Sequence, residues 1–180
     1  MSGQFISFEG IDGSGKSTQI QFLEKELIEK GINVHIFREP GSTLLSEKIR
    51  EILLDRKNID LCSVSESMLF AAARGQLVEE KINPALANGD WVICDRYADS
   101  TIAYQGYGRG VDVNKLSEIN TIATGGLTPD VTFIIDLDPK KASERMNSDE
   151  PDRMESIGNN FFRDVISGYH QITLQNPRRC

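Results

Sequence analysis

Residues 9–18 read EGIDGSGKST and directly follow FISF, an apolar run at residues 5–8. Residues 10–17 match the pattern G-x-x-x-x-G-K-[ST] and stand between a predicted strand and a predicted helix. Glycines in such a loop let successive backbone N–H groups point inward, and the N-terminus of the following helix adds partial positive charge. The stretch therefore predicts a phosphate-binding loop, or P-loop, at the end of the first strand.

The side chains of this loop predict a nucleoside triphosphate site. We expect Lys16 to reach the outer phosphates and the Ser17 hydroxyl to bind a Mg²⁺ ion that bridges them. Asp12 is unusual, because a carboxylate in an anion-binding loop repels the ligand. It is expected to face a hydroxyl of a second substrate or a metal-bound water, and the alternative is a solvated loop residue. The predicted ATP-binding residues are Gly10, Ile11, Asp12, Gly13, Ser14, Gly15, Lys16, Ser17 and Thr18.

Strands and helices are predicted to alternate along the chain. Almost continuously apolar runs predict buried strands at 4–9, 33–37, 91–95 and 131–136. Helical spacing of apolar residues is found at 20–27, 65–88, 113–124 and 161–169. This alternation predicts an α/β fold in which helices wrap both faces of a parallel sheet. We expect one domain over residues 1–180.

The composition argues against several classes of protein. A chain of 180 residues that is 39% hydrophobic fits one domain with a substantial core. The net charge of -7 and the sequence pI near 4.9 disfavour a nucleic-acid partner, because a polyanion would be repelled. The three cysteines lack C-x-x-C spacing, and no apolar run is long enough to span a bilayer. We expect a soluble cytoplasmic protein with no membrane or nucleic-acid partner.

Three classes of P-loop protein compete for this sequence. A switch GTPase needs N-K-x-D, and the nearest match at 114–117 lacks the aspartate. A motor needs a water-activating carboxylate after a strand, but the strands at 91–95 and 131–136 continue into arginine and leucine. Arg38 and Arg96 each follow a strand, at the edge where an open α/β sheet binds ligands. Two guanidinium groups there predict a second, phosphate-bearing substrate, and so a small-molecule kinase.

Four stretches together resemble bacterial thymidylate kinases. They are FEGIDGSGKST (8–18), FREPG (37–41), DRYADSTIAYQGYGRG (95–110) and DRMES (152–156). The resemblance runs from residue 4 to about 169 and implies the P-loop nucleoside monophosphate kinase fold. It implies transfer of the ATP γ-phosphoryl group to dTMP, giving dTDP for dTTP synthesis, with Mg²⁺ and a homodimer packed through helices. The alternatives are a P-loop regulator that hydrolyses nucleotide slowly, or a kinase for another nucleoside monophosphate.

The resemblance also implies roles for single residues. Asp12 would meet the deoxyribose 3′-hydroxyl or a metal-bound water, and Arg38 and Arg96 would bind the acceptor phosphate. Tyr104 would lie under the sugar and disfavour a 2′-hydroxyl, and Asp95 would hold Mg²⁺ through water, with Ser17 as the other metal residue. The implied dTMP-binding residues are Asp12, Arg38, Glu39, Phe70, Arg74, Arg96, Ser100, Tyr104 and Gln105.

The base pocket and the lid complete the implied site. Phe70 would stack on thymine, and Arg74, one helical turn further, would bond to a base oxygen. A lid at about 143–156 would exclude water and bring Arg145 or Arg153 to the phosphoryl group. The implied catalytic residues are Asp12, Lys16, Arg96, Arg145 and Arg153. The family continues into a last strand and helix that frame adenine, so we expect this chain, ending at Cys180, either to be truncated or to build that pocket differently.

Overall fold

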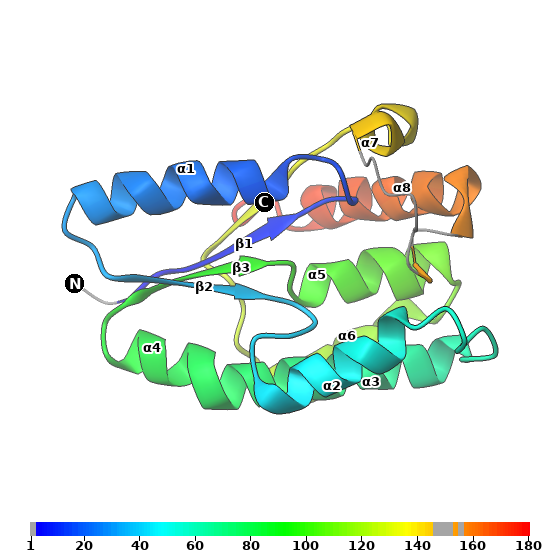
Figure 1. Ribbon diagram of the computed structural model, residues 1–180, viewed down its shortest axis with the longest axis horizontal. Coiled ribbons are helices and arrows are strands. Elements are labelled where there is room, and N and C mark those ends of the chain that lie inside the picture. Colours follow the sequence, from blue (N-terminus) through cyan, green and yellow to red (C-terminus); the bar gives the residue numbers. More distant parts are fainter. Residues whose placement is uncertain (1–2, 146–152, 155–156) are drawn as a thin grey trace.

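The computed structural model describes residues 3–145, 153–154 and 157–180, and its strands form a four-stranded parallel sheet (Figure 1). The strands are β1 (Phe5–Glu9), β2 (Val34–Arg38), β3 (Trp91–Asp95) and β4 (Val131–Ile134). Their order is β2-β3-β1-β4, so β1 lies between β3 and β4. All four predicted strands are present within two residues of their predicted bounds. Because the sheet is parallel, the carboxyl ends of the strands share one edge.

Side chains of the central strands alternate between two apolar faces. On one face, Ile6, Phe8 and Ile93 pack against helix α1 (Lys16–Glu29) through Ile20 and Leu27. On the other face, strand residues pack against one continuous helical segment. The strand residues are Phe5, Val92 and Cys94, and the segment consists of α3 (Ser63–Leu77), η1 (Val78–Ile82) and α4 (Asn83–Ala87). The predicted α/β fold with helices on both faces is confirmed.

The predicted helices are present, and the described residues form three more helical segments that were not predicted. The predicted ones are α1, the α3–η1–α4 segment, α6 (Val113–Thr124) and α8 (Asn159–Gln175). The further ones are α2 (Leu44–Leu54), α5 (Ala98–Thr101) continued by η2 (Ile102–Gly108), and α7 (Pro139–Arg145). In α2 a signal was available, because Thr43 caps the helix by accepting a hydrogen bond from the Ser46 amide at 3.0 Å.

The sequence did not predict η2 because the segment contains glycines, which disfavour helices. Packing explains why glycines stand where η2 meets α8. A Cβ atom at Gly108 would lie 2.5 Å from the Phe161 ring, and one at Gly168 would lie 2.8 Å from the Tyr107 ring. Only glycine at these places lets α8 approach η2 so closely, and the two elements lie side by side in Figure 1.

Among the described residues, no helix combines the length and the apolar character that a membrane span requires.

Candidate active site

A cavity of about 140 Å³ opens at the carboxyl edge of the sheet, beside the P-loop. Seven of the nine residues implied for dTMP binding line it: Asp12, Glu39, Phe70, Arg96, Ser100, Tyr104 and Gln105. The other lining residues are Pro40, Arg50, Leu54, Thr101 and Met154. The cavity therefore has a charged end at Asp12 and Arg96, next to the P-loop, and an apolar wall that includes Phe70, Leu54 and Met154.

The P-loop turns through three glycines whose φ angles lie in the left-handed region. These are Gly10 at 132°, Gly13 at 75° and Gly15 at 105°. Ile11 is buried in the core, whereas Ser17 and Thr18 are exposed in the first turn of α1. The Ser14 hydroxyl is buried, and within the described part of the chain it has no hydrogen-bond partner. A buried hydroxyl beside a helix N-terminus suits a bound phosphate oxygen.

Lys16 bends back over the loop that precedes it. Its Nζ atom donates to the carbonyl oxygens of Gly10 and Ile11, at 3.1 Å each, and lies 3.9 Å from Asp12. Burial lowers the pKa of Lys16 to about 8, and the nearby Arg96 charge acts in the same direction. The ammonium group is thus held by weak acceptors, which a triphosphate can replace.

Asp12 forms an ion pair with Arg96. Arg96 Nη2 donates to Asp12 Oδ1 at 2.8 Å and to the Tyr104 hydroxyl at 3.1 Å. Burial acts to raise the pKa of Asp12, but the Arg96 and Lys16 charges outweigh it and lower the pKa below the usual value. These two cations therefore offset the repulsion between a carboxylate in this loop and a bound phosphate.

Glu9 helps to hold Arg96 in place through two shared hydroxyl groups. It was not among the predicted site residues. Its buried carboxylate accepts from the Ser100 hydroxyl at 2.6 Å and from the Tyr169 hydroxyl at 2.9 Å. Arg96 Nη1 in turn donates to these two hydroxyls at 3.3 and 3.5 Å. Burial, together with the Asp99 charge, raises the pKa of Glu9 to about 7. One feature of the sequence could have indicated a role for Glu9: it is a carboxylate at the end of an otherwise apolar, buried strand.

Two oxygen atoms suited to a divalent cation lie together at the ends of the P-loop and β3. The Ser17 hydroxyl donates to Asp95 Oδ2 at 3.4 Å. Mg²⁺ takes one or two protein oxygens and fills its remaining positions with water and substrate phosphates. The pair therefore fits the ion that the sequence implies.

Comparisons with known proteins agree with this geometry. Residues 8–179 match the family model described as thymidylate kinase. A thymidylate kinase of Chlorobaculum tepidum is 53% identical over an alignment of 184 positions, and the match covers 97% of this chain and 86% of that protein. One of Thermoanaerobacter sp. (strain X514) is 48% identical over 179 residues, or 99% and 88% of the two chains. The chain belongs to the thymidylate kinase family.

A solved structure of this family has the same fold. The crystal structure of thymidylate kinase from Ehrlichia chaffeensis matches with a TM-score of 0.84 at 41% identity. The match covers 100% of this chain and 91% of that one. The P-loop nucleoside monophosphate kinase fold implied by the sequence motifs is thereby confirmed.

Arg38 does not line the cavity as the thymidylate kinase resemblance implied. Its Nη2 atom donates to both carboxylate oxygens of Glu47, at 2.8 and 3.0 Å, on the exposed side of α2. Glu47 also accepts from the Ser42 amide at 2.7 Å, which fixes it in place. Arg50, on the missed helix α2, lines the cavity instead, and its Nη1 atom donates to the Pro40 carbonyl at 3.0 Å.

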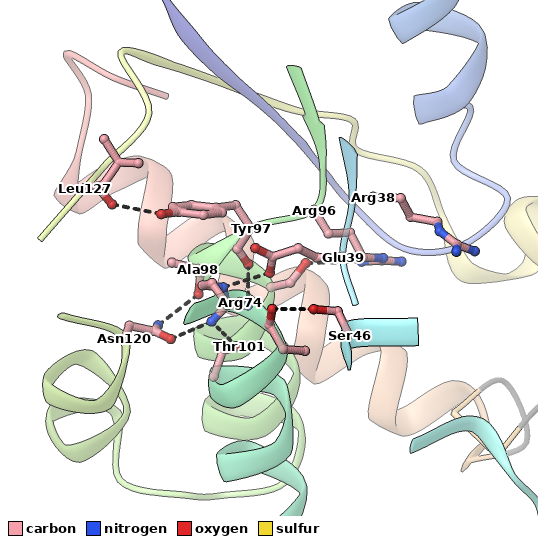
Figure 2. A network of polar contacts seen from close by, with 12 residues as sticks. Arg38, Glu39, Ser46, Arg74, Arg96, Tyr97, Ala98, Thr101, Asn120 and Leu127 are labelled. Atoms are coloured by element: carbon pink, nitrogen blue, oxygen red, sulfur yellow. Dashed lines mark hydrogen bonds and ion pairs between the residues drawn. The ribbon is translucent and has the colours of Figure 1, made fainter. Parts of the chain in front are cut away.

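Arg74 lies beneath the cavity, where it forms a buried network (Figure 2). Its Nε atom donates to Glu39 Oε2 at 2.7 Å, and its Nη1 atom donates to Thr101 and Asn120 at 3.0 and 2.7 Å. Nη2 donates to the Tyr97 carbonyl at 3.1 Å. At most one N–H group of Arg74 therefore remains for a base oxygen, and its contacts instead join α3, α5, α6 and the end of β2.

Arg153, an implied catalytic residue, does not line the cavity. Its guanidinium is buried in an ion pair with Glu66 at 2.6 Å, and its Nε atom donates to the Leu53 carbonyl at 2.7 Å. In this arrangement Glu66 already engages the Arg153 guanidinium, so its catalytic role stays a prediction. Arg145 is exposed at the end of α7. The rest of the implied lid, at 146–152 and 155–156, lies outside the described residues.

We expect Arg74→Met to lower the free energy of unfolding by about 3–5 kcal/mol, measured by urea denaturation. The substitution leaves Glu39 as a buried carboxylate without a cation, and burial already raises the pKa of Glu39 to about 7. Arg38→Met is the matched control, because it breaks an exposed pair and should cost less than about 1 kcal/mol. Equal losses in the two variants would contradict the importance of burial.

The pKa of Lys16 predicts the alkaline limb of activity. With dTMP held well below its KM, kcat/KM for ATP should fall about tenfold per pH unit above about pH 8, because free enzyme loses the Lys16 proton. Lys16→Arg keeps its charge, so its slower reaction should lack this limb. A wild-type profile that stays flat to about pH 9.5 would rule out Lys16 as the titrating group.

Proposed function

We propose that the cavity binds dTMP and that the P-loop binds the triphosphate of ATP. As a thymidylate kinase, the chain transfers the γ-phosphoryl group of ATP to dTMP, giving dTDP and ADP for dTTP synthesis. The observation that carries this placement is the Asp12–Arg96 pair at the P-loop end of the cavity. It supplies a guanidinium group where the acceptor phosphate has to lie.

In this arrangement, position and charge account for most of the catalysis. The acceptor is already a phosphate oxyanion, so no general base is needed. Arg96 would hold that phosphate, while Lys16 would neutralise charge on the transferring group. Asp12 would accept a hydrogen bond from the 3′-hydroxyl, and Tyr104 would crowd a 2′-hydroxyl. Phe70 would stack on the base.

We assign Mg²⁺ to Ser17 and Asp95, whose oxygen atoms lie 3.4 Å apart. When bound, the ion would neutralise part of the charge on the ATP phosphates. The remaining P-loop residues would cradle those phosphates through backbone N–H groups. The reaction uses small, water-soluble nucleotides, so we place it in the cytoplasm, without a nucleic-acid or membrane partner.

Arg145 is our candidate for the lid cation in place of Arg153. It is the last residue of α7. The segment that leads into α7 passes close to the P-loop, because a Cβ atom added at Gly10 would lie 2.5 Å from the Ile135 carbonyl oxygen. The chain therefore enters α7 from beside the P-loop. No acceptor holds it within the part of the chain that the structure describes, in contrast to Arg153.

The reaction predicts acceptor-dependent turnover. In a coupled assay with Mg²⁺ and ATP, ADP should appear rapidly with dTMP and only at background rate without it. The readout separates a kinase, in which water is excluded, from a P-loop regulator that hydrolyses nucleotide slowly. Equal ADP release with and without dTMP would favour the regulator.

Arg145→Ala should lower kcat by about 10²-fold or more while leaving the KM for dTMP within a few-fold. Arginines that meet the transition state contribute roughly 10³–10⁵ in related phosphoryl transfers, and such contacts affect kcat rather than ground-state binding. Lys141→Ala, which removes an exposed charge from the same helix, is the control and should change kcat little. A near-normal kcat for Arg145→Ala would remove this arginine from the mechanism.

A homodimer is the assembly we propose, through the neighbouring helices α2 and α3. Leu45 and Ile52 of α2 and Val64 and Met68 of α3 are exposed apolar side chains. Obligate homodimers typically bury apolar side chains of this kind in the interface between their subunits.

Sedimentation at micromolar concentration should therefore show a dimer. Met68→Glu should shift it to monomer, because the variant places a charge in the apolar interface. Phe22→Glu alters an even more exposed apolar residue, on α1, and should leave the dimer intact. A wild-type protein that sediments only as a monomer would refute the assembly.

A further inference from the structure

Glu66 is a fully buried carboxylate that the mechanism above does not use. It projects from α3, and its oxygen atoms accept hydrogen bonds from three other residues. Arg153 lies at 2.6 Å, Arg109 donates at 3.2 and 3.3 Å, and the amide nitrogen of Gln105 donates at 2.9 Å. Of these, Gln105 is the one that also lines the cavity.

The two guanidinium groups determine which end of the Gln105 amide faces Glu66. A carboxylate between two arginines accepts hydrogen bonds and has no proton to donate. Gln105 therefore turns its NH₂ group toward Glu66, and its carbonyl oxygen Oε1 must point the other way. Among the described residues, no donor reaches Oε1. Gln105 thus offers the cavity a hydrogen-bond acceptor.

The acceptor lies where a base would bind. The phosphate of a nucleotide belongs at the Asp12–Arg96 end, next to the P-loop, so the base lies further along the cavity. Phe70, the aromatic residue of the cavity wall, follows Glu66 by four residues on α3, which places both on one face of that helix. A base stacked on Phe70 would present its edge toward Gln105.

We propose that Glu66 is a positioning residue that sets the base preference of the pocket through Gln105. An amide oxygen in this orientation accepts from the N3–H of thymine or uracil. Cytosine has an acceptor at N3, so its N3 lone pair would face the lone pair of Gln105 Oε1 with no hydrogen atom between them. Such unpaired contacts give strong discrimination between otherwise similar substrates. The inference rests on the proposed binding of dTMP in this cavity.

The test is the ratio of kcat/KM for dTMP to kcat/KM for dCMP in Glu66→Gln. A glutamine at this place can donate as well as accept, so Gln105 becomes free to turn its NH₂ group into the cavity. We expect the dTMP/dCMP ratio to fall at least about tenfold. The dTMP/dUMP ratio should stay within about twofold of wild type, because both bases carry N3–H. A purely structural defect would not separate these two ratios.

Arg109→Met is the matched control, because it removes the half-buried arginine partner of Glu66 but leaves Glu66 an acceptor held by Arg153. It should keep the wild-type dTMP/dCMP ratio even if it lowers stability. If Glu66→Gln does not fold, the double variant Glu66→Met/Arg153→Met replaces the closest pair with apolar side chains, a change that proteins often tolerate. It also deprives the Gln105 amide of its acceptor, so the ratio should fall again.

Two results would overturn the inference: an unchanged dTMP/dCMP ratio in a folded Glu66 variant, or an equal fall in Arg109→Met. In either case wild-type turnover of dTMP would still stand. A wild-type protein that does not phosphorylate dTMP would instead overturn the proposed function, so the two failures are distinguishable.

Discussion

Arg96 follows β3 directly, adopts a φ of 73°, and donates to Asp12 of the P-loop at 2.8 Å. The contact is possible because β1 and β3 are parallel neighbours whose carboxyl ends share one edge. It links the loop that would hold ATP to the cavity that would hold dTMP. A left-handed φ is uncommon for arginine, and such backbone strain concentrates at functional sites. The phosphate of the acceptor is the charge that this geometry suits.

Layers of polar groups hold this cation in place. Glu9 binds Ser100 and Tyr169, and both hydroxyls face the Arg96 guanidinium. Further from the P-loop, Glu39 and Glu66 are buried carboxylates paired with Arg74 and with Arg109 and Arg153. Burying such pairs contributes little net stability, but breaking one is costly. Their value here lies in fixing the side chains of the cavity wall in one orientation.

The arginines show how far a sequence motif can be trusted. Arg96 lies in the DRYADS stretch and lines the cavity, and the resemblance also implied site roles for Arg74 and for Arg153 of the DRMES stretch. Yet the last two are buried beside Glu39 and Glu66, residues that lie far from them in the chain. Arg50 was overlooked because α2 was not predicted, although Thr43 and Glu47 mark its first turn. A motif identifies which arginines matter without specifying what each one contacts.

The sequence by itself determined the P-loop, the four strands, the alternation with helices and the family. The loop, strands and helices depend on neighbours within a few residues, through glycine spacing and apolar periodicity, and the family was evident from four short motifs taken together. Only the tertiary structure decided which cations enter the cavity, which lie beneath it, and which way the Gln105 amide faces. The physical reason is that the role of a guanidinium or an amide depends on the partner buried beside it. That partner is brought near only when β1, α3 and η2 pack together.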